Sequence, residues 1–231
     1  SMRPRQWTKN LVVFAALIFS YNLTDTFLLT RTVIGFLVFC VLSGWVYLLN
    51  DLLDRDKDRM HPDKRERPIA SGRLPVALVV GVLVVLLAVG LGVGWWIGND
   101  FFWVALAFVA LNTAYSLHLR SKVLLDVIAI ATSFVLRALA GAEVLIASGE
   151  PVRISPWLLL CTFFLALFLA LGKRRAELRS VSHEHRRSLQ DYSVELVDRL
   201  TTVTVAVTVL CYSIYTIWPE TVENFGTERL V

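Results

Sequence analysis

The stretch TVIGFLVFCVLSGWVYLL (residues 32–49), followed at once by NDLLDRDKDRMHPDKRERPIASG (residues 50–72), decides how this chain folds. The first part is apolar enough, and almost long enough, to cross a membrane as a helix. The second part holds five aspartates and seven basic or histidine residues. Such a join predicts a charged loop at a membrane surface.

The spacing of three of these aspartates predicts a metal site. Asp51, Asp54 and Asp58 stand at i, i+3 and i+7, which puts them on one helix face beside Asn50. Carboxylates stacked so closely repel one another unless a cation lies between them. Mg²⁺ is usually held by one or two carboxylates together with substrate phosphate oxygens, so we expect Mg²⁺ and a diphosphate here. The alternative is a solvated loop of mixed charge, stabilised by local ion pairs.

The composition is that of a membrane protein. Of the 231 residues, 56% are hydrophobic and 18% charged, with a mean hydropathy of +0.61. In soluble domains roughly 45 to 50% of residues are apolar and about 25% are charged. We expect a single domain over residues 1–231, an all-α polytopic transmembrane bundle. Its seven expected spans are residues 11–23, 32–49, 76–98, 101–117, 124–147, 156–172 and 200–218. The first is the weakest because Asn22, Thr24 and Asp25 cut it short, so it can tilt, start earlier near Trp7 or be partly re-entrant.

The distribution of Lys and Arg predicts the orientation. With seven spans, 19 of the 23 Lys and Arg residues fall on one side, in the N-terminus and in the loops after the second, fourth and sixth spans. The positive-inside rule makes that side cytoplasmic, so the N-terminus and the acidic loop are expected to face the cytoplasm at the cell (inner) membrane. These loops also account for the net charge of +4 without any nucleic-acid binding.

Three polar clusters are candidate phosphate ligands. They are Lys64, Arg65 and Arg67 in the acidic loop, Tyr115, Arg120 and Lys122 at the end of the fourth span, and Lys173, Arg174, Arg175 and Glu177 after the sixth. Because the second, fourth and sixth spans all end on the cytoplasmic side, their polar ends can surround one cavity open to the cytoplasm. For the last two clusters, the alternative is anchoring to anionic lipid headgroups.

Two polar residues inside spans support an interior site. Asn112 lies in the fourth span and Arg137 in the fifth, and such residues usually face the bundle interior or a water-filled cavity. Either Asp126 or Glu143 is the expected partner of Arg137. An ion pair that only packs helices together is the alternative.

These residues resemble a known family. The pattern NDxxDxxxD at residues 50–58, followed by DKRxRPIASG at residues 63–72, is similar to the first aspartate motif of the UbiA superfamily of intramembrane prenyltransferases. RPRQWTKN at residues 3–10, Tyr115-Ser116 and GKRRAEL at residues 172–178 resemble, more specifically, its decaprenyl-phosphate phosphoribosyltransferase branch. In the quinone- and haem-prenylating branches a second aspartate-rich motif follows the sixth span, where KRRAE stands here. The resemblance covers essentially the whole chain.

The resemblance implies transfer of 5-phosphoribosyl from phosphoribosyl pyrophosphate to a polyprenyl (decaprenyl) phosphate, as a step of cell-envelope biosynthesis. The three aspartates, with Asn50, would hold Mg²⁺ on the pyrophosphate, and the cations of the acidic loop would clamp it. The cations at residues 173–175 would hold the 5-phosphate or the lipid phosphate. The cluster after the fourth span would position the lipid phosphate, which is already an anion and needs no general base. Glu177 would contact a ribose hydroxyl or orient a nearby cation.

Two other functions stay open. A UbiA-type prenyltransferase would move a prenyl group from a prenyl diphosphate to an aromatic or quinone acceptor, with residues 173–175 binding an acceptor carboxylate. The missing second aspartate motif speaks against it. A non-enzymatic transporter or channel, with the acidic loop as a regulatory cation site, would need polar residues through the depth of several spans. Those in this chain cluster at the cytoplasmic ends.

The resemblance also raises the question of length. Members of the superfamily usually have nine spans, whereas this chain ends at Val231 after seven. Residues 218–231 are expected to be the extracytoplasmic loop before an eighth span. We therefore expect the last two helices to be missing, whether the chain is a truncation, the ordered part of a longer chain or a naturally short relative.

Overall fold

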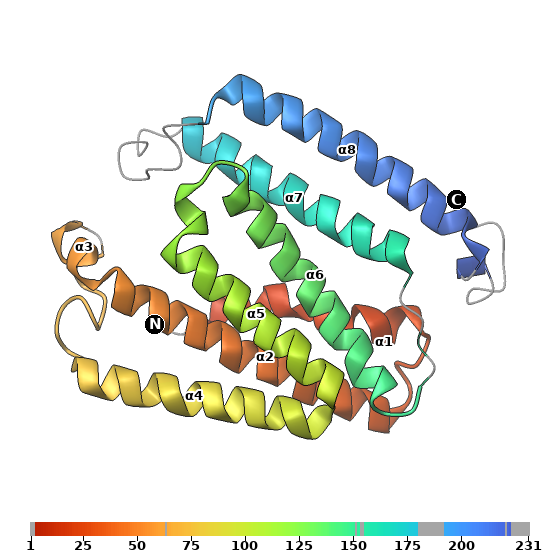
Figure 1. Ribbon diagram of the computed structural model, residues 1–231, viewed down its shortest axis with the longest axis horizontal. Helices are drawn as coiled ribbons and strands as arrows, with labels where there is room; N and C mark the ends of the chain where they lie inside the picture. Colours follow the sequence, from red (N-terminus) through yellow and green to blue (C-terminus); the bar gives the residue numbers. More distant parts are fainter. Residues whose placement is uncertain are drawn as a thin grey trace.

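The computed structural model describes residues 3–62, 64–150, 152, 155–179, 192–219 and 221–222. Within these ranges the regular elements are all helical, and six helices are long and apolar enough to cross a membrane (Figure 1), which confirms an all-α membrane bundle. They are α2 (Thr26–Leu53), α4 (Val76–Ile97), α5 (Asn99–Leu117), α6 (Leu125–Ile146), α7 (Pro156–Arg179) and α8 (Val194–Ile217). Asp63, together with residues 220 and 223–231 of the expected terminal loop, lies outside the described residues.

The first expected span, residues 11–23, is not a regular α-helix. A 3-10 helix, η1 (Pro4–Phe14), leads into a short α-helix, α1 (Ala15–Phe19), so the helical segment starts earlier than its apolar run. Arg3, before η1, contacts Asp51 near the end of α2, so this segment runs antiparallel to α2. Eleven residues of 3-10 helix and five of α-helix extend about 30 Å, roughly the thickness of a bilayer core. A seventh crossing made in this way stays a prediction.

An apolar core joins α2, α4, α5 and α6. Phe39 of α2 packs edge-on against Phe101 of α5, with ring centroids 5.9 Å apart, and lies 5.0 Å from the ring of Phe108. Gly90 lets α4 approach α2 closely, since a Cβ there would lie 2.6 Å from Leu42 Cδ2. These contacts fix the position of α2, whose last turn carries the start of the acidic motif.

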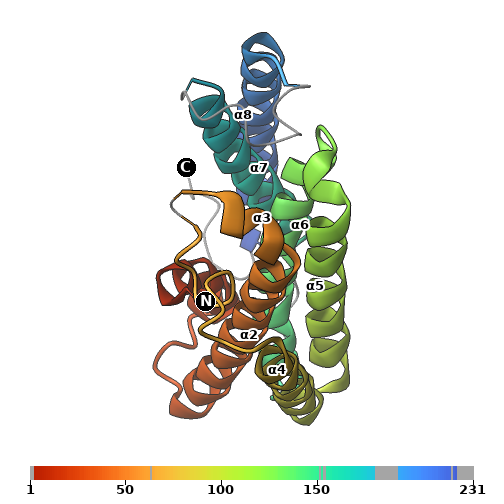
Figure 2. The same ribbon diagram turned by 90° about the vertical axis from the view of Figure 1, so that its left-hand side faces the viewer.

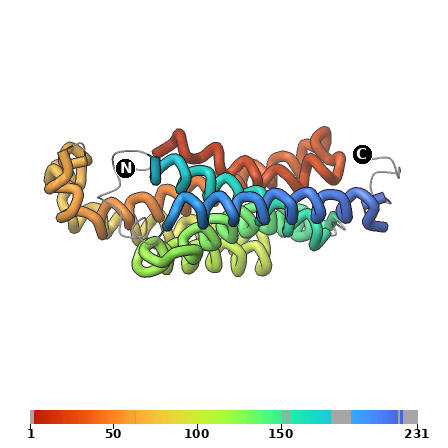
Figure 3. The backbone as a smooth tube through the Cα atoms, turned by 90° about the horizontal axis from the view of Figure 1, so that it is seen from above, coloured from red at the N-terminus to blue at the C-terminus, as the bar shows by residue number. Residues whose placement is uncertain are grey.

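Helices α7 and α8 form an antiparallel pair along one edge of the bundle (Figures 1 and 3). A second apolar cluster attaches the pair to α6 through Val127, Leu171 and Val197, each buried almost completely. The outer face of α8 leaves Val203, Val209 and other apolar side chains exposed. Such a surface suits contact with lipid tails.

The polar ends of α2, α5 and α7 meet at one end of the bundle, which Figure 2 faces. Arg120, in the 3-10 turn η2 (Leu119–Ser121) after α5, reaches Asp54 after α2. Arg174, near the end of α7, reaches Asp126 at the start of α6. The contacts confirm that the second, fourth and sixth expected spans end together. A cavity between these ends stays a prediction.

Candidate active site

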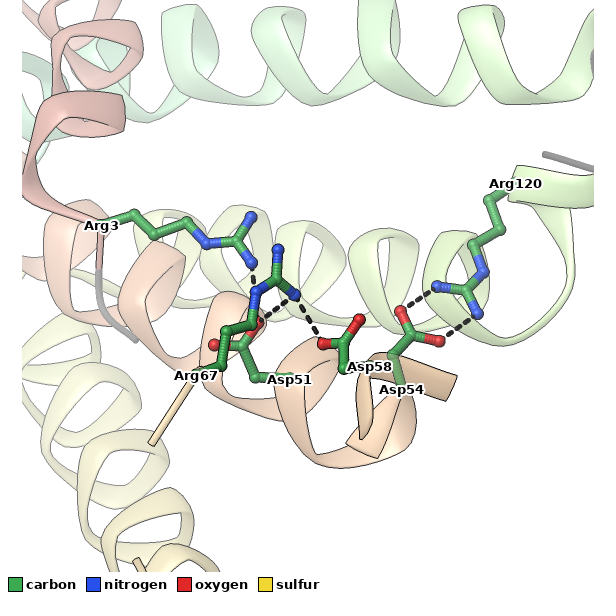
Figure 4. A network of polar contacts seen from close by, with 6 residues as sticks. All are labelled: Arg3, Asp51, Asp54, Asp58, Arg67 and Arg120. Atoms are coloured by element: carbon green, nitrogen blue, oxygen red, sulfur yellow. Dashed lines mark hydrogen bonds and ion pairs between the residues drawn. The ribbon is translucent and has the colours of Figure 1, made fainter. Parts of the chain in front are cut away.

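The acidic motif lies across a break between two helices. α2 ends one residue before Asp54, whose φ of −91° and ψ of 5° leave the helical region, and α3 (Arg55–Met60) follows. Asp54 N–H still donates to Asn50 O at 2.9 Å, and Asp58 N–H to Asp54 O at 2.8 Å, so the chain bends without unwinding. The three carboxylates therefore do not stack on one straight face, as their spacing predicts. Asp51 and Asp58 bind one arginine, and Asp54 turns to another (Figure 4).

Asp51 and Asp58 are both buried, at 3% and 5% exposure, and share one cation. Arg67 Nη1 donates to Asp58 Oδ2 at 2.7 Å and to Asp51 Oδ1 at 3.2 Å. Arg3 brings a second cation, because its Nη2 donates to the same Asp51 oxygen at 2.7 Å. Two buried carboxylates need this opposite charge, since an uncompensated buried charge is strongly destabilising. The N-terminal segment is thus part of the site.

Asp54 forms a separate pair with Arg120. Arg120 Nη1 and Nη2 donate to the two Asp54 oxygens at 2.7 and 2.6 Å, a bidentate geometry. Partial burial opposes ionisation of Asp54, but the hydrogen bonds and charge of Arg120, with Lys57 and Lys64 nearby, outweigh it and lower the pKa of Asp54. The hydrogen bonds to Asp54 raise the pKa of Arg120. Both groups are therefore ionised at neutral pH.

The oxygens left over in this cluster suit a hard cation. Asp51 Oδ2 and Asp58 Oδ1 accept no hydrogen bond from a described residue, and the buried Asn50 Oδ1 has no partner there either. Two carboxylates and an amide oxygen, completed by substrate phosphates, are a suitable donor set for Mg²⁺. In the described ranges, however, no group of three His, Cys, Asp or Glu residues could hold a metal ion. Asp54 does not join the other two carboxylates here, because Arg120 occupies both of its oxygens. A metal held by all three carboxylates stays a prediction.

Four further candidates lie around this cluster. Lys64 is half-buried, and its charge acts on the carboxylate that Arg120 binds. Arg65 and Lys122 are exposed. Tyr115, in the last turn of α5, is close enough to act electrostatically on Arg120 and on an arginine of α7. Lys64 and Tyr115 therefore belong to the site's surroundings, whereas Arg65 and Lys122 sit at the surface.

The basic segment at the end of α7 does not act as one cluster. Consecutive residues of a helix point about 100° apart, and its three cations differ in burial and in contacts, although Lys173 and Arg174 both lie near Glu177. Lys173 is exposed, with Nζ 3.8 Å from Glu177 Oε1. Arg174 is buried, at 1% exposure. Arg175 binds both carboxylate oxygens of Asp198 in α8, away from the acidic motif.

Arg174 belongs to a buried network that joins α6, α7 and the approach to α8. Its Nε donates to Asp126 Oδ2 at 2.8 Å, and its Nη1 to Glu177 Oε2 at 2.5 Å. Tyr192 donates its hydroxyl hydrogen to Asp126 Oδ1 at 2.7 Å and accepts from Leu124 N–H at 2.8 Å. Burial, and then the hydrogen bond to Asp126, raise the pKa of Tyr192. Arg174 therefore has a packing role that its position in a basic run does not predict.

Arg137 does not pair with the acidic residues expected from the sequence. It donates to Asn10 Oδ1 and to Ser133, and forms no ion pair with a carboxylate in the described part of the chain. Asp126 lies eleven residues earlier on the same helix, about 16 Å away along its axis, and Glu143 points about 120° away around it. Helix geometry alone excludes both pairs.

The structure adds Arg3, Tyr192 and Asp198 to the residues at this end of the bundle. Arg3 stands in the basic N-terminal segment and opens the motif RPRQWTKN, and these were the signals available for it. Tyr192 and Asp198 precede the seventh expected span and belong to no motif. Their roles depend on contacts with α6 and α7 that a single sequence does not show.

Comparison with known proteins places the chain in a family. Residues 11–219 match the model of the UbiA prenyltransferase family. A decaprenyl-phosphate phosphoribosyltransferase from Mycolicibacterium smegmatis is 33% identical over 224 residues, covering 93% of this chain and 68% of that protein. One of the same name from Corynebacterium glutamicum is 34% identical over 229 residues, covering 93% and 65%. The chain thus spans about two thirds of the length of these relatives.

A solved structure shares the fold. A UbiA homologue from Archaeoglobus fulgidus, bound to DMAPP and Mg²⁺, superposes with a TM-score of 0.78 at 22% identity, covering 99% of this chain and 81% of that one. The family model matches most of the chain, and both relatives exceed 30% identity. The protein is therefore a membrane transferase of the UbiA prenyltransferase family.

Proposed function

We propose that the protein transfers 5-phosphoribosyl from phosphoribosyl pyrophosphate to a polyprenyl phosphate and releases pyrophosphate. The bond between ribose C1 and the pyrophosphate oxygen breaks, and its electron pair leaves with the pyrophosphate. A phosphate oxygen of the lipid forms the new bond to C1. The names of the relatives at 33% and 34% identity support this choice of substrates.

The observation that carries the proposal is the meeting of three aspartates with three arginines from separate segments. Arg3 precedes η1, Arg67 lies in the loop after α3, and Arg120 follows α5, yet all three reach the acidic motif. In such an arrangement the arginines can bind an anion while the aspartates bind the metal ion that accompanies it. A metal-bound pyrophosphate has that combination of charges.

The residues that fit Mg²⁺ are Asp51, Asp58 and Asn50. When bound, Mg²⁺ would neutralise charge on the departing pyrophosphate and so make it a better leaving group. Arg67 keeps the two carboxylates together, and Asp54 holds Arg120 beside them. The Mg²⁺ bound in the Archaeoglobus homologue supports a metal in this family.

The arginines that neutralise the carboxylates are the groups we assign to the pyrophosphate. A planar guanidinium matches phosphate oxygens as well as carboxylate oxygens. When a pyrophosphate and its metal bind, Arg67 and Arg120 would move from the carboxylates to the phosphate oxygens, and the metal would take their place on the carboxylates. The positive and negative charges would stay balanced. Lys64 and Arg65 add positive charge nearby. Donors already in place lower the cost of organising the site around the leaving group.

The lipid phosphate needs positioning more than it needs a base, because it is already an anion at neutral pH. Tyr115 in the last turn of α5 and Lys122 after it are candidates for holding it. Lys173 is a candidate for this phosphate or for the 5-phosphate of the donor. Arg174 is bound to protein carboxylates, so we assign it a positioning role: it orients Glu177, the candidate for a ribose hydroxyl.

We propose that this end of the bundle faces the cytoplasm at the cell membrane. It gathers the N-terminal arginine and the loops that carry most of the 23 Lys and Arg residues. Phosphoribosyl pyrophosphate would enter from the water, and the polyprenyl tail would leave sideways into the bilayer. The positive-inside rule supports this orientation.

The test is a transfer assay with two donors. The purified protein is incubated with Mg²⁺, polyprenyl phosphate and radiolabelled phosphoribosyl pyrophosphate, and in parallel with a labelled prenyl diphosphate and 4-hydroxybenzoate. We expect label in the lipid phase from the first donor, abolished by EDTA. Prenylated 4-hydroxybenzoate alone would make the protein an aromatic prenyltransferase, and silence in both tubes would contradict the proposal.

A further inference from the structure

Arg137 is a buried cation that the proposed mechanism does not use. It lies in the middle of α6, with 6% of its surface exposed. Its Nε donates to Asn10 Oδ1 at 2.8 Å, and its Nη1 to the backbone O and the Oγ of Ser133 at 2.6 and 2.8 Å. All three acceptors are neutral, so nothing in these hydrogen bonds balances the positive charge.

The surroundings of Arg137 stabilise a cation without cancelling its charge. Its guanidinium carbon lies 4.7 Å from the ring centre of Phe108 and 5.3 Å from that of Phe134. In the described part of the chain no carboxylate forms an ion pair with it. Its Nη2 donates to no described residue. A buried charge within a membrane span is costly, and such residues usually mark a functional site.

Two lysines strengthen the positive charge at this place. Lys9 precedes the Asn10 that binds Arg137, and the charges of Arg137 and Lys173 both act on its ammonium group. The exposed Lys9 and Lys173 come from η1 and α7, and Arg137 from α6. Lys173 also lies 3.8 Å from Glu177 Oε1, so one carboxylate offsets part of this charge. The remaining positive charge favours a bound anion.

A close backbone contact holds this arrangement in place. A Cβ at Gly141 would lie only 2.0 Å from Val13 O, so η1 rests directly on α6 at that glycine. Gly141 is one turn from Arg137 and therefore on the same face of α6. The contact fixes the position along α6 at which Asn10 binds Arg137.

The cationic group adjoins the acidic motif through Tyr47 of α2. The charges of Arg137 and Arg3 both act on the Tyr47 hydroxyl. Arg3 lies over the Tyr47 ring at 5.2 Å and also binds Asp51. Tyr47 stands one helical turn before Asp51, so the group centred on Arg137 lies next to the proposed pyrophosphate site, on its inner side.

We propose that Arg137, Lys9 and Lys173 form an internal subsite that binds a phosphate monoester, with Arg137 Nη2 and the two ammonium groups as donors. The inference rests on the proposed function, whose two substrates each carry one such group, the lipid phosphate and the 5-phosphate of the donor. Either would be held beside the pyrophosphate site, where the reacting C1 must lie. Three cations with no carboxylate partner for Arg137 supply the charge that a dianion needs.

The test is direct binding without turnover. Affinities of the wild type, Arg137→Gln, Arg137→Lys and Lys9→Gln are measured separately for polyprenyl phosphate and for phosphoribosyl pyrophosphate with Mg²⁺. Polyprenol and inorganic pyrophosphate, which lack the monoester, serve as ligand controls. The matched control variant is Arg31→Gln, because Arg31 likewise donates to a neutral acceptor, Ile97 O, and packs on an aromatic ring, Trp96, but at the other end of α2.

We expect Arg137→Gln to weaken binding of one of the two substrates by about 10- to 100-fold, the effect of losing a charged hydrogen-bond donor. Arg137→Lys should recover part of the loss, and Lys9→Gln should weaken the same substrate. If the variants bind polyprenyl phosphate more weakly but polyprenol as before, the subsite holds the lipid phosphate. If they bind phosphoribosyl pyrophosphate more weakly but inorganic pyrophosphate as before, the subsite holds the 5-phosphate.

Three results would overturn the subsite. They are wild-type affinity for both substrates in folded Arg137→Gln, equal losses for both, and a loss shared by Arg31→Gln. If Arg137→Gln does not fold, Lys9→Gln decides, since its side chain is exposed. If the wild type binds neither substrate, the proposed function itself is contradicted. If the wild type and the variants bind both substrates equally well, only the subsite is contradicted.

Discussion

Replacing Arg67 by glutamine should destabilise the protein when divalent metal is absent. The change removes the hydrogen bonds from Arg67 Nη1 to Asp51 and Asp58. Asp51 keeps Arg3, but Asp58, whose side chain is 6% exposed, keeps no ion pair with a described residue. Removing one partner of a buried pair costs about 3 to 5 kcal/mol. Because the side chain of Arg67 is itself 31% exposed, the lower end applies.

The assay is thermal unfolding in detergent, with EDTA or with millimolar Mg²⁺. For a chain of this length, about 3 kcal/mol corresponds to a fall in Tm of roughly 6 to 12 °C. Mg²⁺ should recover part of that fall, since a cation between Asp51 and Asp58 replaces the missing positive charge. The matched control is Arg65→Gln, an exposed arginine of the same loop, which should change Tm little in either condition.

Two results would refute this reasoning. Arg67→Gln as stable as the wild type in EDTA would show that Arg67 does not balance the buried carboxylates. A lowered Tm that Mg²⁺ leaves unchanged would show that the two carboxylates do not hold the metal between them.

Three further predictions concern the contacts around the site. Arg120→Gln should lower Tm equally at pH 7 and pH 5, and its effect should decline only as the pH falls below 3.8, because the pKa of Asp54 is lowered from that ordinary value; a constant effect at all pH values would contradict this. Gly141→Ala should lower Tm and binding of one phosphate-bearing substrate together, because the new Cβ pushes η1 off α6; an unchanged Tm would show that the contact is loose. Arg174→Met should destabilise by about 3 kcal/mol or more, since it leaves Asp126 buried without its cation, whereas Arg175→Met, at the surface, should cost much less; equal falls in Tm would contradict the buried network.

The membrane bundle and the location of the acidic motif could be predicted from the sequence. Apolar runs of about 20 residues are a strong signal in any span, and the structure has a long helix over six of the seven predicted. The first run was ambiguous because polar residues cut it short, and the structure builds it as η1 and α1. Nothing in the local sequence identifies a 3-10 helix there.

The pairing of charges in the site could not be predicted. The spacing of Asp51, Asp54 and Asp58 was interpreted on one straight helix, and no glycine or proline marks the break at Asp54. The partners Arg3 and Arg120 come from 48 and 66 residues away, so only the folded chain reveals them.

The divergence of the α7 cations could have been predicted. Lys173, Arg174 and Arg175 are consecutive, and three consecutive residues of a helix cannot all face one ligand. Helix geometry also argued against the pairs expected for Arg137. In both cases the residue types drew attention, but their positions on the helix decided their contacts.

The most direct test of the account follows the two ends of the donor separately. Phosphoribosyl pyrophosphate labelled with one isotope in the 5-phosphate and another in the pyrophosphate is incubated with the protein, Mg²⁺ and polyprenyl phosphate, and the phases are separated. We expect the 5-phosphate label to enter the lipid phase while an equal amount of the other isotope appears as free pyrophosphate in the water. Both isotopes together in the lipid phase, or neither one there, would contradict it.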